Sequence, residues 1–292
     1  MSLAYLLQYS PAAFISFCSF FGLIVGSFLN VVIVRLPKML EREWAQQCAE
    51  LSAKMPEPLP PSELLPPYNL VTPRSACVQC GHKIAAMENI PLISYALLRG
   101  RCSNCKTSIS LRYPAVELLT AVVSGYVAWH FGYGFAAFAA LPFTWAMIVL
   151  AFIDIDMQLL PDDITMPLLW SGLLLNLADT FTDIRSAVLG VVAGYIALWS
   201  MYWIFKLVTK REGMGYGDFK LLAAIGAWLG WQMLPLVILV SSMAGSIVGA
   251  GLIAIAKRKR YEPIPFGPYL AGSGFAALLW GKQLNQAYWN FF

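Results

Sequence analysis

The sequence predicts an all-α polytopic membrane protein with about eight transmembrane helices and one polar, cytosolic insertion. First, only 12% of the 292 residues are charged and 59% are hydrophobic, whereas soluble domains carry about 25% charged residues. Second, the mean hydropathy is +0.64. Third, apolar segments recur along the chain, most of them near the ~20 residues that a helix needs to cross ~30 Å of hydrocarbon.

Eight apolar segments each predict a helix. In chain order they are Pro11–Val34, Pro114–Phe131, Phe135–Ile153, Ile164–Ala178, Ser186–Leu207, Phe219–Trp231, Leu234–Ala256 and Phe266–Gly281. The fourth and the sixth are short, so one of them could be re-entrant. The first ten residues contain no Lys or Arg, so the basic start of a signal peptide is missing and we expect the first segment to remain as an anchor.

The basic residues predict the orientation, because cytosolic loops are rich in Lys and Arg. Ten of them lie in residues 35–112, four in 206–220 and four in 257–260, whereas Arg185 and Lys282 alone fall on the other side. Both termini therefore face away from the cytosol. The loop after the third segment is also expected to be cytosolic, although it carries only acidic residues.

This pattern predicts three parts. Residues 1–34 form the first transmembrane helix, residues 35–112 form the cytosolic insertion, and residues 113–292 form a transmembrane bundle. Within the insertion, the proline-rich stretch Met55–Asn69 predicts an extended connector.

The insertion contains two Cys-x-x-Cys pairs, "CVQC" and "CSNC", and their spacing predicts a tetrahedral zinc site. The four ligands are Cys77, Cys80, Cys102 and Cys105. Gly81 follows the first pair and permits a tight turn. A site closed by four sulfurs has no open position, so the zinc is expected to be structural and to stabilise a small domain with little core.

Other interpretations of the insertion are weaker. Disulfides or a redox pair are disfavoured because the cytosol is reducing. A zinc ribbon can bind nucleic acid, but six glutamates balance the ten basic residues and no basic stripe with aromatics is evident, so we expect no nucleic-acid partner. We interpret His82 as a polar neighbour of the site, and Cys18 and Cys48 as ordinary reduced thiols.

Two aspartates lie at the predicted cytosolic edge of the bundle. Asp154 directly follows the apolar run that ends at Ile153, and Asp218 directly precedes the run that starts at Phe219, so the two share a depth. Carboxylates at this level are costly unless they are paired or hydrated. If the two lie close together, they hold one proton between them.

Such a pair suits peptide hydrolysis, since one carboxylate can deprotonate water while the other polarises the scissile carbonyl. Gly215 and Gly217 would then leave bare backbone beside Asp218, where a substrate strand could approach.

Three alternatives remain. Asp156, Asp162 and Asp163 suit solvated loop residues, and Asp162 could cap the following helix. An ion-coupled transporter would use the same acids, although transporters place them nearer the bilayer midplane. A zinc-bearing membrane adaptor would perform no chemistry.

The chain resembles the bacterial type IV prepilin peptidases over nearly its whole length. Landmarks that match in order are "GSFLNVVIVRLP", the two cysteine pairs, "ENIPLISY", "RYPAVELL", "IDIDMQLLPDDIT", "GMGYGDFKLLAAIGAW" and "PIPFGPYL". By this resemblance Asp154 and Asp218 are the catalytic aspartates, Gly215–Asp218 is the GxGD motif, and the cysteine tetrad is the family's. Met157 departs from the His that many relatives carry.

The resemblance implies an activity and a location. Such enzymes remove a basic leader from type IV prepilins and type II secretion pseudopilins and then methylate the new N-terminal residue with S-adenosylmethionine. They are multi-pass proteins of the bacterial inner membrane, with the active site at the cytosolic face and, here, both termini periplasmic. No glycine-rich loop after a strand indicates where the methyl donor binds. Gly100, between Arg99 and Arg101, could let a cofactor approach the backbone, but a simple turn is favoured.

Overall fold

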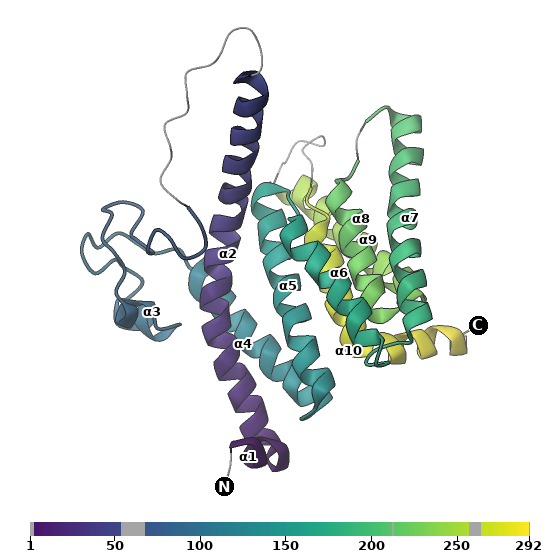
Figure 1. Ribbon diagram of the computed structural model, residues 1–292, viewed down its shortest axis with the longest axis horizontal. Coiled ribbons are helices and arrows are strands. Elements are labelled where there is room, and N and C mark those ends of the chain that lie inside the picture. The colour runs from purple at the N-terminus through teal and green to yellow at the C-terminus, as the bar shows by residue number, and fades with distance from the viewer. Residues whose placement is uncertain (1–2, 54–67, 212, 257–263, 292) are drawn as a thin grey trace. The chain divides into compact units, whose positions relative to one another are not determined.

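The structure is a computed structural model that describes residues 3–53, 68–211, 213–256 and 264–291 (Figure 1). Within these residues the regular secondary structure is helical, which confirms the all-α prediction. The helices are α1 (Leu3–Tyr9), α2 (Pro11–Ala53), η1 (Ala86–Asn89), α3 (Ile93–Leu97), α4 (Arg112–Phe131), α5 (Phe135–Met157), α6 (Asp162–Asn176), α7 (Ile184–Thr209), α8 (Tyr216–Leu229), η2 (Trp231–Met233), α9 (Leu234–Ala256) and α10 (Gly267–Phe291).

The chain divides into two compact units. One is Ile15–Gly125, and the other joins Met1–Phe14 to Tyr126–Phe292. The predicted insertion begins inside α2, which continues past Arg35 as one helix to Ala53. The functional division at residues 34 and 112 stays a prediction.

Every predicted apolar segment coincides with a helix, but fewer helices qualify as membrane spans than the eight predicted. Among the described residues, four helical stretches are long and apolar enough to cross a bilayer: Pro11–Leu51, Phe135–Met157, Ile184–Thr209 and Trp231–Leu252. α6 has 15 residues and α8 has 14, which is only about 21–23 Å of helix. The structure thus shows a membrane protein, whereas a count of eight spans is not confirmed.

Helix α8 lies inside the larger unit. From Leu221 to Leu229 every residue is buried, as expected for a helix that is apolar on all sides. Glycines in α7 allow the backbones to approach closely. A Cβ on Gly194 would lie 2.8 Å from the carbonyl oxygen of Leu222, and Gly190 faces the backbone of Gly226.

Buried polar groups fix the far end of α8. Asn176, at the end of α6, donates through Nδ2 to the carbonyl oxygens of Ala227 (2.8 Å) and Trp228 (3.0 Å). In return, the Trp228 indole donates to the carbonyl oxygen of Leu168 at 2.7 Å. The two bonds from Asn176 satisfy carbonyls that the end of α8 would otherwise leave unpaired. α8 is therefore held against α6 and α7, which determines where its first turn lies.

The smaller unit is built on the packing of α2 against α4. A Cβ on Gly26 would lie 2.8 Å from the Cα of Glu117, and the Asn30 side-chain amide donates to the carbonyl oxygen of Tyr113 at 3.0 Å. Farther along α2, Arg35 donates to the carbonyl oxygen of Asn69 at 3.0 Å. Asn69 is thus tied to α2 at the level of Arg35.

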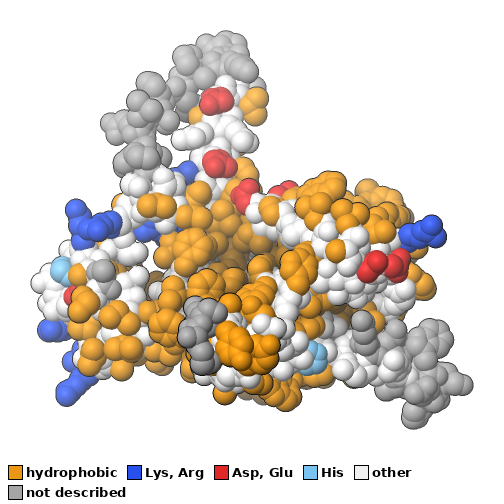
Figure 2. Space-filling view, turned by 60° about the horizontal axis from the view of Figure 1, so that its bottom comes forward, with side chains coloured by type: hydrophobic (Ala, Val, Ile, Leu, Met, Phe, Trp, Pro, Cys, Tyr) orange, Lys and Arg blue, Asp and Glu red, His pale blue; other side chains and the backbone are white. Residues whose placement is uncertain are grey.

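Exposed side chains are largely apolar, as Figure 2 shows for one face of the molecule. Large hydrophobic side chains that are more than a third exposed occur on each of the four candidate spans. A surface of this kind suits contact with lipid. The basic cluster Lys257–Arg260 and most of the proline-rich connector lie outside the described residues.

Candidate active site and metal centre

Asp154 lies near the end of α5 and is only 6% exposed. Its Oδ2 accepts a hydrogen bond from the backbone N–H of Gly267, the first residue of α10, at 2.9 Å. A Cβ on Gly267 would lie 2.7 Å from that oxygen, so glycine is needed for this approach. The N-terminal end of α10 therefore stabilises negative charge on Asp154.

Asp218 lies in the first turn of α8 and is also 6% exposed. Its Oδ2 accepts a hydrogen bond from the backbone N–H of Gly215, the N-cap residue, at 3.2 Å. The other oxygen, Oδ1, is buried and has no hydrogen-bond partner among the described protein atoms. Because buried polar atoms are nearly always paired, this oxygen is placed for a proton, a water or a substrate.

The fold brings the two aspartates together although they are far apart in the sequence. Both belong to the larger unit, and they are close enough for the charge of Asp154 to act on Asp218. Two buried carboxyl groups in this relation do not both ionise readily.

The other acids near this part of the chain, at the end of α5 and the start of α6, differ from Asp154 and Asp218. Asp156, Asp162 and Asp163 are exposed. Lys220 Nζ donates to both carboxylate oxygens of Asp162, at 2.8 and 2.7 Å. The N-cap position of α6 is occupied by Pro161, so Asp162 stands in the first helical turn, where a negative charge is favoured by the helix dipole. Its specific contact links α6 to α8.

The two motif glycines serve different purposes. A Cβ on Gly217 would lie 2.8 Å from the Cβ of Leu160, so this glycine lets α8 pack against the turn that follows α5. Around Gly215 the nearest atoms to such a Cβ are 3.9 Å away. Open backbone for a substrate is therefore available at Gly215 and not at Gly217.

Sequence reasoning gave no role to Gly267 or Leu160, which complete the surroundings of the aspartates. Gly267 was part of a recognised landmark, "PIPFGPYL". A glycine next to a proline at the start of an apolar run could have indicated close backbone approach at a helix N-terminus. No comparable signal marks Leu160.

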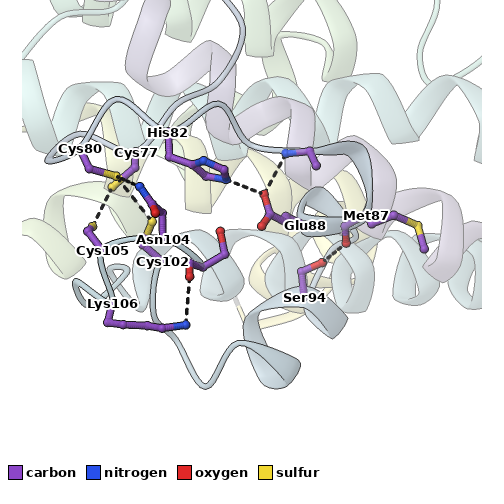
Figure 3. Close-up of polar contacts among 12 residues, drawn as sticks. Cys77, Cys80, His82, Met87, Glu88, Ser94, Cys102, Asn104, Cys105 and Lys106 are labelled. Atoms are coloured by element: carbon purple, nitrogen blue, oxygen red, sulfur yellow. Dashed lines mark hydrogen bonds and ion pairs between the residues drawn. The ribbon is translucent and has the colours of Figure 1, made fainter.

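The four predicted cysteine ligands gather in the smaller unit, with their sulfurs within 4.8 Å of one another. Cys77 Sγ lies 3.7 Å from Cys105 Sγ, and Cys80 Sγ lies 4.0 Å from Cys102 Sγ (Figure 3). Four sulfurs about 2.3 Å from a central zinc would be roughly 3.8 Å apart, whereas a disulfide requires about 2.05 Å. The arrangement thus fits a tetrahedral metal ion.

Each pair of cysteines lies on a tight turn of the same design. Cys77 N–H donates to the carbonyl of His82 at 2.8 Å, and Cys102 N–H donates to the carbonyl of Thr107 at 2.9 Å. The residue after each pair adopts a positive φ, 68° at Gly81 and 58° at Lys106. This geometry turns both sulfurs of a pair toward the same point.

Neighbouring groups favour the metal-binding thiolate form at Cys77 and Cys105, whose thiol pKa values are lowered, whereas the pKa of the Cys80 thiol is raised. The side chain and backbone of Thr107 hydrogen-bond to Cys105 and lower the pKa of its thiol to about 6. Asn104 Nδ2 donates to Cys80 Sγ at 3.8 Å. His82 is directed toward Glu88 instead, with its Nε2 3.5 Å from Oε2 (Figure 3).

Comparison with known proteins gives two family matches. Residues 20–131 match the family model described as the bacterial peptidase A24 N-terminal domain, and residues 141–250 match the one described as the type IV leader peptidase family. No solved structure matches the chain significantly.

Similar proteins match over almost their whole length. A prepilin leader peptidase/N-methyltransferase of Pseudomonas aeruginosa is 53% identical, covering 96% of this chain and 95% of the relative. Proteins of the same description from Aeromonas hydrophila and Burkholderia pseudomallei are 55% and 46% identical, covering 95% and 91% of this chain and 94% and 85% of the relatives.

Proposed function

Since the chain belongs to the type IV leader peptidase family, we propose that it is a membrane aspartyl endopeptidase that removes the basic leader of prepilins and pseudopilins. The same chain then methylates the exposed N-terminal residue, with S-adenosylmethionine as donor. The observation that carries the peptidase assignment is the buried pair Asp154 and Asp218. The relatives give no support to the ion-coupled transporter.

The geometry supports different roles for the two carboxyl groups. Each carboxyl accepts one backbone N–H at a helix N-terminus, Asp154 from Gly267 at 2.9 Å and Asp218 from Gly215 at 3.2 Å, so this contact favours a carboxylate at both and the difference lies in the other oxygens. Asp218 Oδ1 is buried without a partner, which favours a protonated carboxyl aimed at the substrate. We therefore assign water activation to Asp154 and proton donation to Asp218.

The reaction then runs with a balanced proton count. Asp154 takes a proton from water as the water oxygen bonds to the scissile carbonyl carbon, and Asp218 gives its proton to the carbonyl oxygen. The tetrahedral intermediate collapses as Asp218 regains that proton. The C–N bond breaks as Asp154 passes its proton to the leaving amine, which restores the starting state of the pair.

Charge near the site suits a basic leader. Asp156 and Asp163 are exposed in the segment that follows Asp154, and they would attract positive side chains of the substrate. Asp162 already forms an ion pair with Lys220, which neutralises its charge. The apolar helix of the substrate would lie in the bilayer beside the candidate spans.

The four cysteines would hold a structural zinc ion. When bound, zinc would link the two knuckle turns of residues 77–82 and 102–107, without an open coordination position for catalysis. We further infer an inner-membrane location with a cytosolic active site and periplasmic termini, in accordance with the basic residues of the sequence. No residue is assigned to the methyl donor.

Separate Asp154→Asn and Asp218→Asn variants test the peptidase assignment. Each keeps the size of the side chain and removes the acid. A purified prepilin and labelled S-adenosylmethionine are added, and the new N-terminus is analysed by mass. Each variant should lose cleavage while it still methylates a pilin that was cleaved beforehand. Normal cleavage by either variant would show the mechanism to be wrong, and acid-dependent charge flux in liposomes would favour transport.

A further inference from the structure

An unusual apolar surface lies next to the cysteine site, on η1 and α3. We define the η1–α3 face as Met87, Ile90, Ile93 and Leu97, which are 78%, 38%, 57% and 78% exposed. Ile93 and Leu97 are one helical turn apart and share a face of α3. The polar residue of the same helix, Ser94, is the one that is buried. This is the reverse of the pattern in water-soluble helices.

One hydrogen bond relates the start of α3 to the level of Gly26 on α2. The backbone N–H of Leu92 donates to Glu117 Oε2 in α4 at 2.9 Å, and the Cα of Glu117 faces Gly26 of α2. Gly26 stands nine residues before Arg35, roughly 13 Å along the helix axis. In Figure 1, α3 accordingly lies beside the apolar part of α2 and not beyond its end.

At the level of Gly26 on α2, we expect lipid to surround the protein. Ile24 and Phe28, which flank Gly26 on α2, are themselves 49% and 52% exposed, and they belong to a helix apolar enough to span a bilayer. Leu92, the residue before Ile93 of the η1–α3 face, is tied to this level through Glu117. Figure 3 shows the Met87 side chain pointing away from Ser94 and from the cysteines.

The charge of the residues around the cysteine site also suits contact with a lipid surface. In residues 68–112 Glu88 is the one acidic residue, whereas six residues are basic: Arg74, Lys83, Arg99, Arg101, Lys106 and Arg112. The balancing glutamates that the structure describes elsewhere in the insertion, Glu41, Glu43 and Glu50, all lie on α2. The balance inferred from the sequence therefore does not hold locally, and the part of the chain that carries the cysteines is strongly basic.

We propose that the η1–α3 face inserts into the bilayer leaflet nearest Arg35, and that Lys83 and Arg99 bind anionic phospholipid headgroups above it. An exposed apolar face with basic residues near it in the chain is typical of interfacial membrane segments. The partner is thus an anionic lipid surface, and the cysteine site is a membrane-attached element. The proposal does not depend on peptidase chemistry.

Photo-crosslinking of the full chain tests the proposal. p-Benzoylphenylalanine replaces Leu97, and the protein is reconstituted in vesicles of phosphatidylcholine and phosphatidylglycerol. After irradiation, intact-mass and peptide analysis identify what the probe has captured. We expect phospholipid adducts at position 97. Val71 is the matched control, because it is 82% exposed but follows Asn69 at the level of Arg35; there the lipid adduct should be lost.

The variants Lys83→Gln and Arg99→Gln test the basic rim. Combined with the probe at position 97, they should remove the enrichment of phosphatidylglycerol among the adducts and leave the total lipid adduct unchanged. Crosslinks from position 97 to peptides of residues 126–292, to another protein or to nucleic acid, without lipid adducts, would overturn the proposal. Equal lipid capture at positions 71 and 97 would also overturn it.

Discussion

The backbone N–H of Gly267 donates a hydrogen bond to Asp154 Oδ2 at 2.9 Å, across 113 positions of the chain. A third segment thus joins the two acidic motifs at the candidate active site. Because a Cβ at position 267 would lie 2.7 Å from that oxygen, Gly267→Ala should displace the carboxylate. A displacement of a catalytic group by about 1 Å can reduce the rate by roughly 100-fold, and we expect a loss of this order for Gly267→Ala.

The measurement is kcat/KM for leader removal. Gly272→Ala in the same helix is the control, since nothing lies within 4 Å of a Cβ there, and its activity should be near that of the unchanged protein. Full activity of Gly267→Ala would show that the hydrogen bond from Gly267 is unnecessary.

Gly217 is predicted to be a packing residue and Gly215 a substrate-facing one. Gly217→Ala would press against Leu160 at 2.8 Å and should lower both thermal stability and activity, whereas adding Leu160→Ala should restore part of both. Gly215→Ala meets no atom closer than 3.9 Å, so its melting temperature should be unchanged. If the substrate approaches this backbone, its KM should rise; an unchanged KM would argue against substrate contact at Gly215.

The ion pair between Asp162 and Lys220 is predicted to position the turn after α5. The Asp162 side chain is 58% exposed, so the pair should contribute no more than about 1 kcal/mol to the free energy of unfolding. Its removal by Asp162→Asn should nevertheless lower kcat, because it links α6 to the helix that carries Asp218.

Asp163→Asn, one residue farther along α6, is the matched control for this ion pair. Thermal melts and kcat are compared for both variants. A large loss of stability with Asp162→Asn, or equal effects of the two variants on kcat, would contradict a positioning role.

Metal removal should unfold the knuckle turns and leave the long helices α2 and α4 to α10 in place. Cys102 is the buried member of the tetrad, so Cys102→Ser should abolish binding of one zinc ion per chain and expose residues 68–111 to protease. Circular dichroism should change little, since most of the helix lies elsewhere. Unchanged protease resistance and activity without zinc would refute a stabilising role.

The metal site also has a predicted pH dependence. The pKa of Cys105 is lowered to about 6 by Thr107, so this thiol is ionised above that pH in the folded chain, and protons compete with the metal as the pH falls through it. Zinc release followed with a chromogenic chelator should therefore shift to higher pH in Thr107→Val, which removes the hydroxyl. An unchanged release profile would contradict the contribution of Thr107.

Much of the molecule could be predicted from the sequence because the determining interactions are local. Apolar segments of helical length predicted the helices, since a helix satisfies its own backbone groups within the segment. The two Cys-x-x-Cys pairs predicted the sulfur cluster, because each short turn orients its own two ligands. The family resemblance was confirmed by relatives that match over nearly the whole chain.

Only the tertiary structure decided which helices and side chains from distant parts of the sequence lie next to one another. It showed that α8 is buried against α6 and α7, that Asp154 and Asp218 share one environment, and that Gly267 completes it. It also placed Glu41, Glu43 and Glu50 on α2, whereas Glu88 is the one acidic residue among the described residues 68–112 that carry the cysteines. These relations arise from side-chain packing between distant helices, and the apolar pattern of each helix is compatible with many partners and rotations. The sequence therefore determined the elements and the chemical groups, while packing determined which of those groups meet.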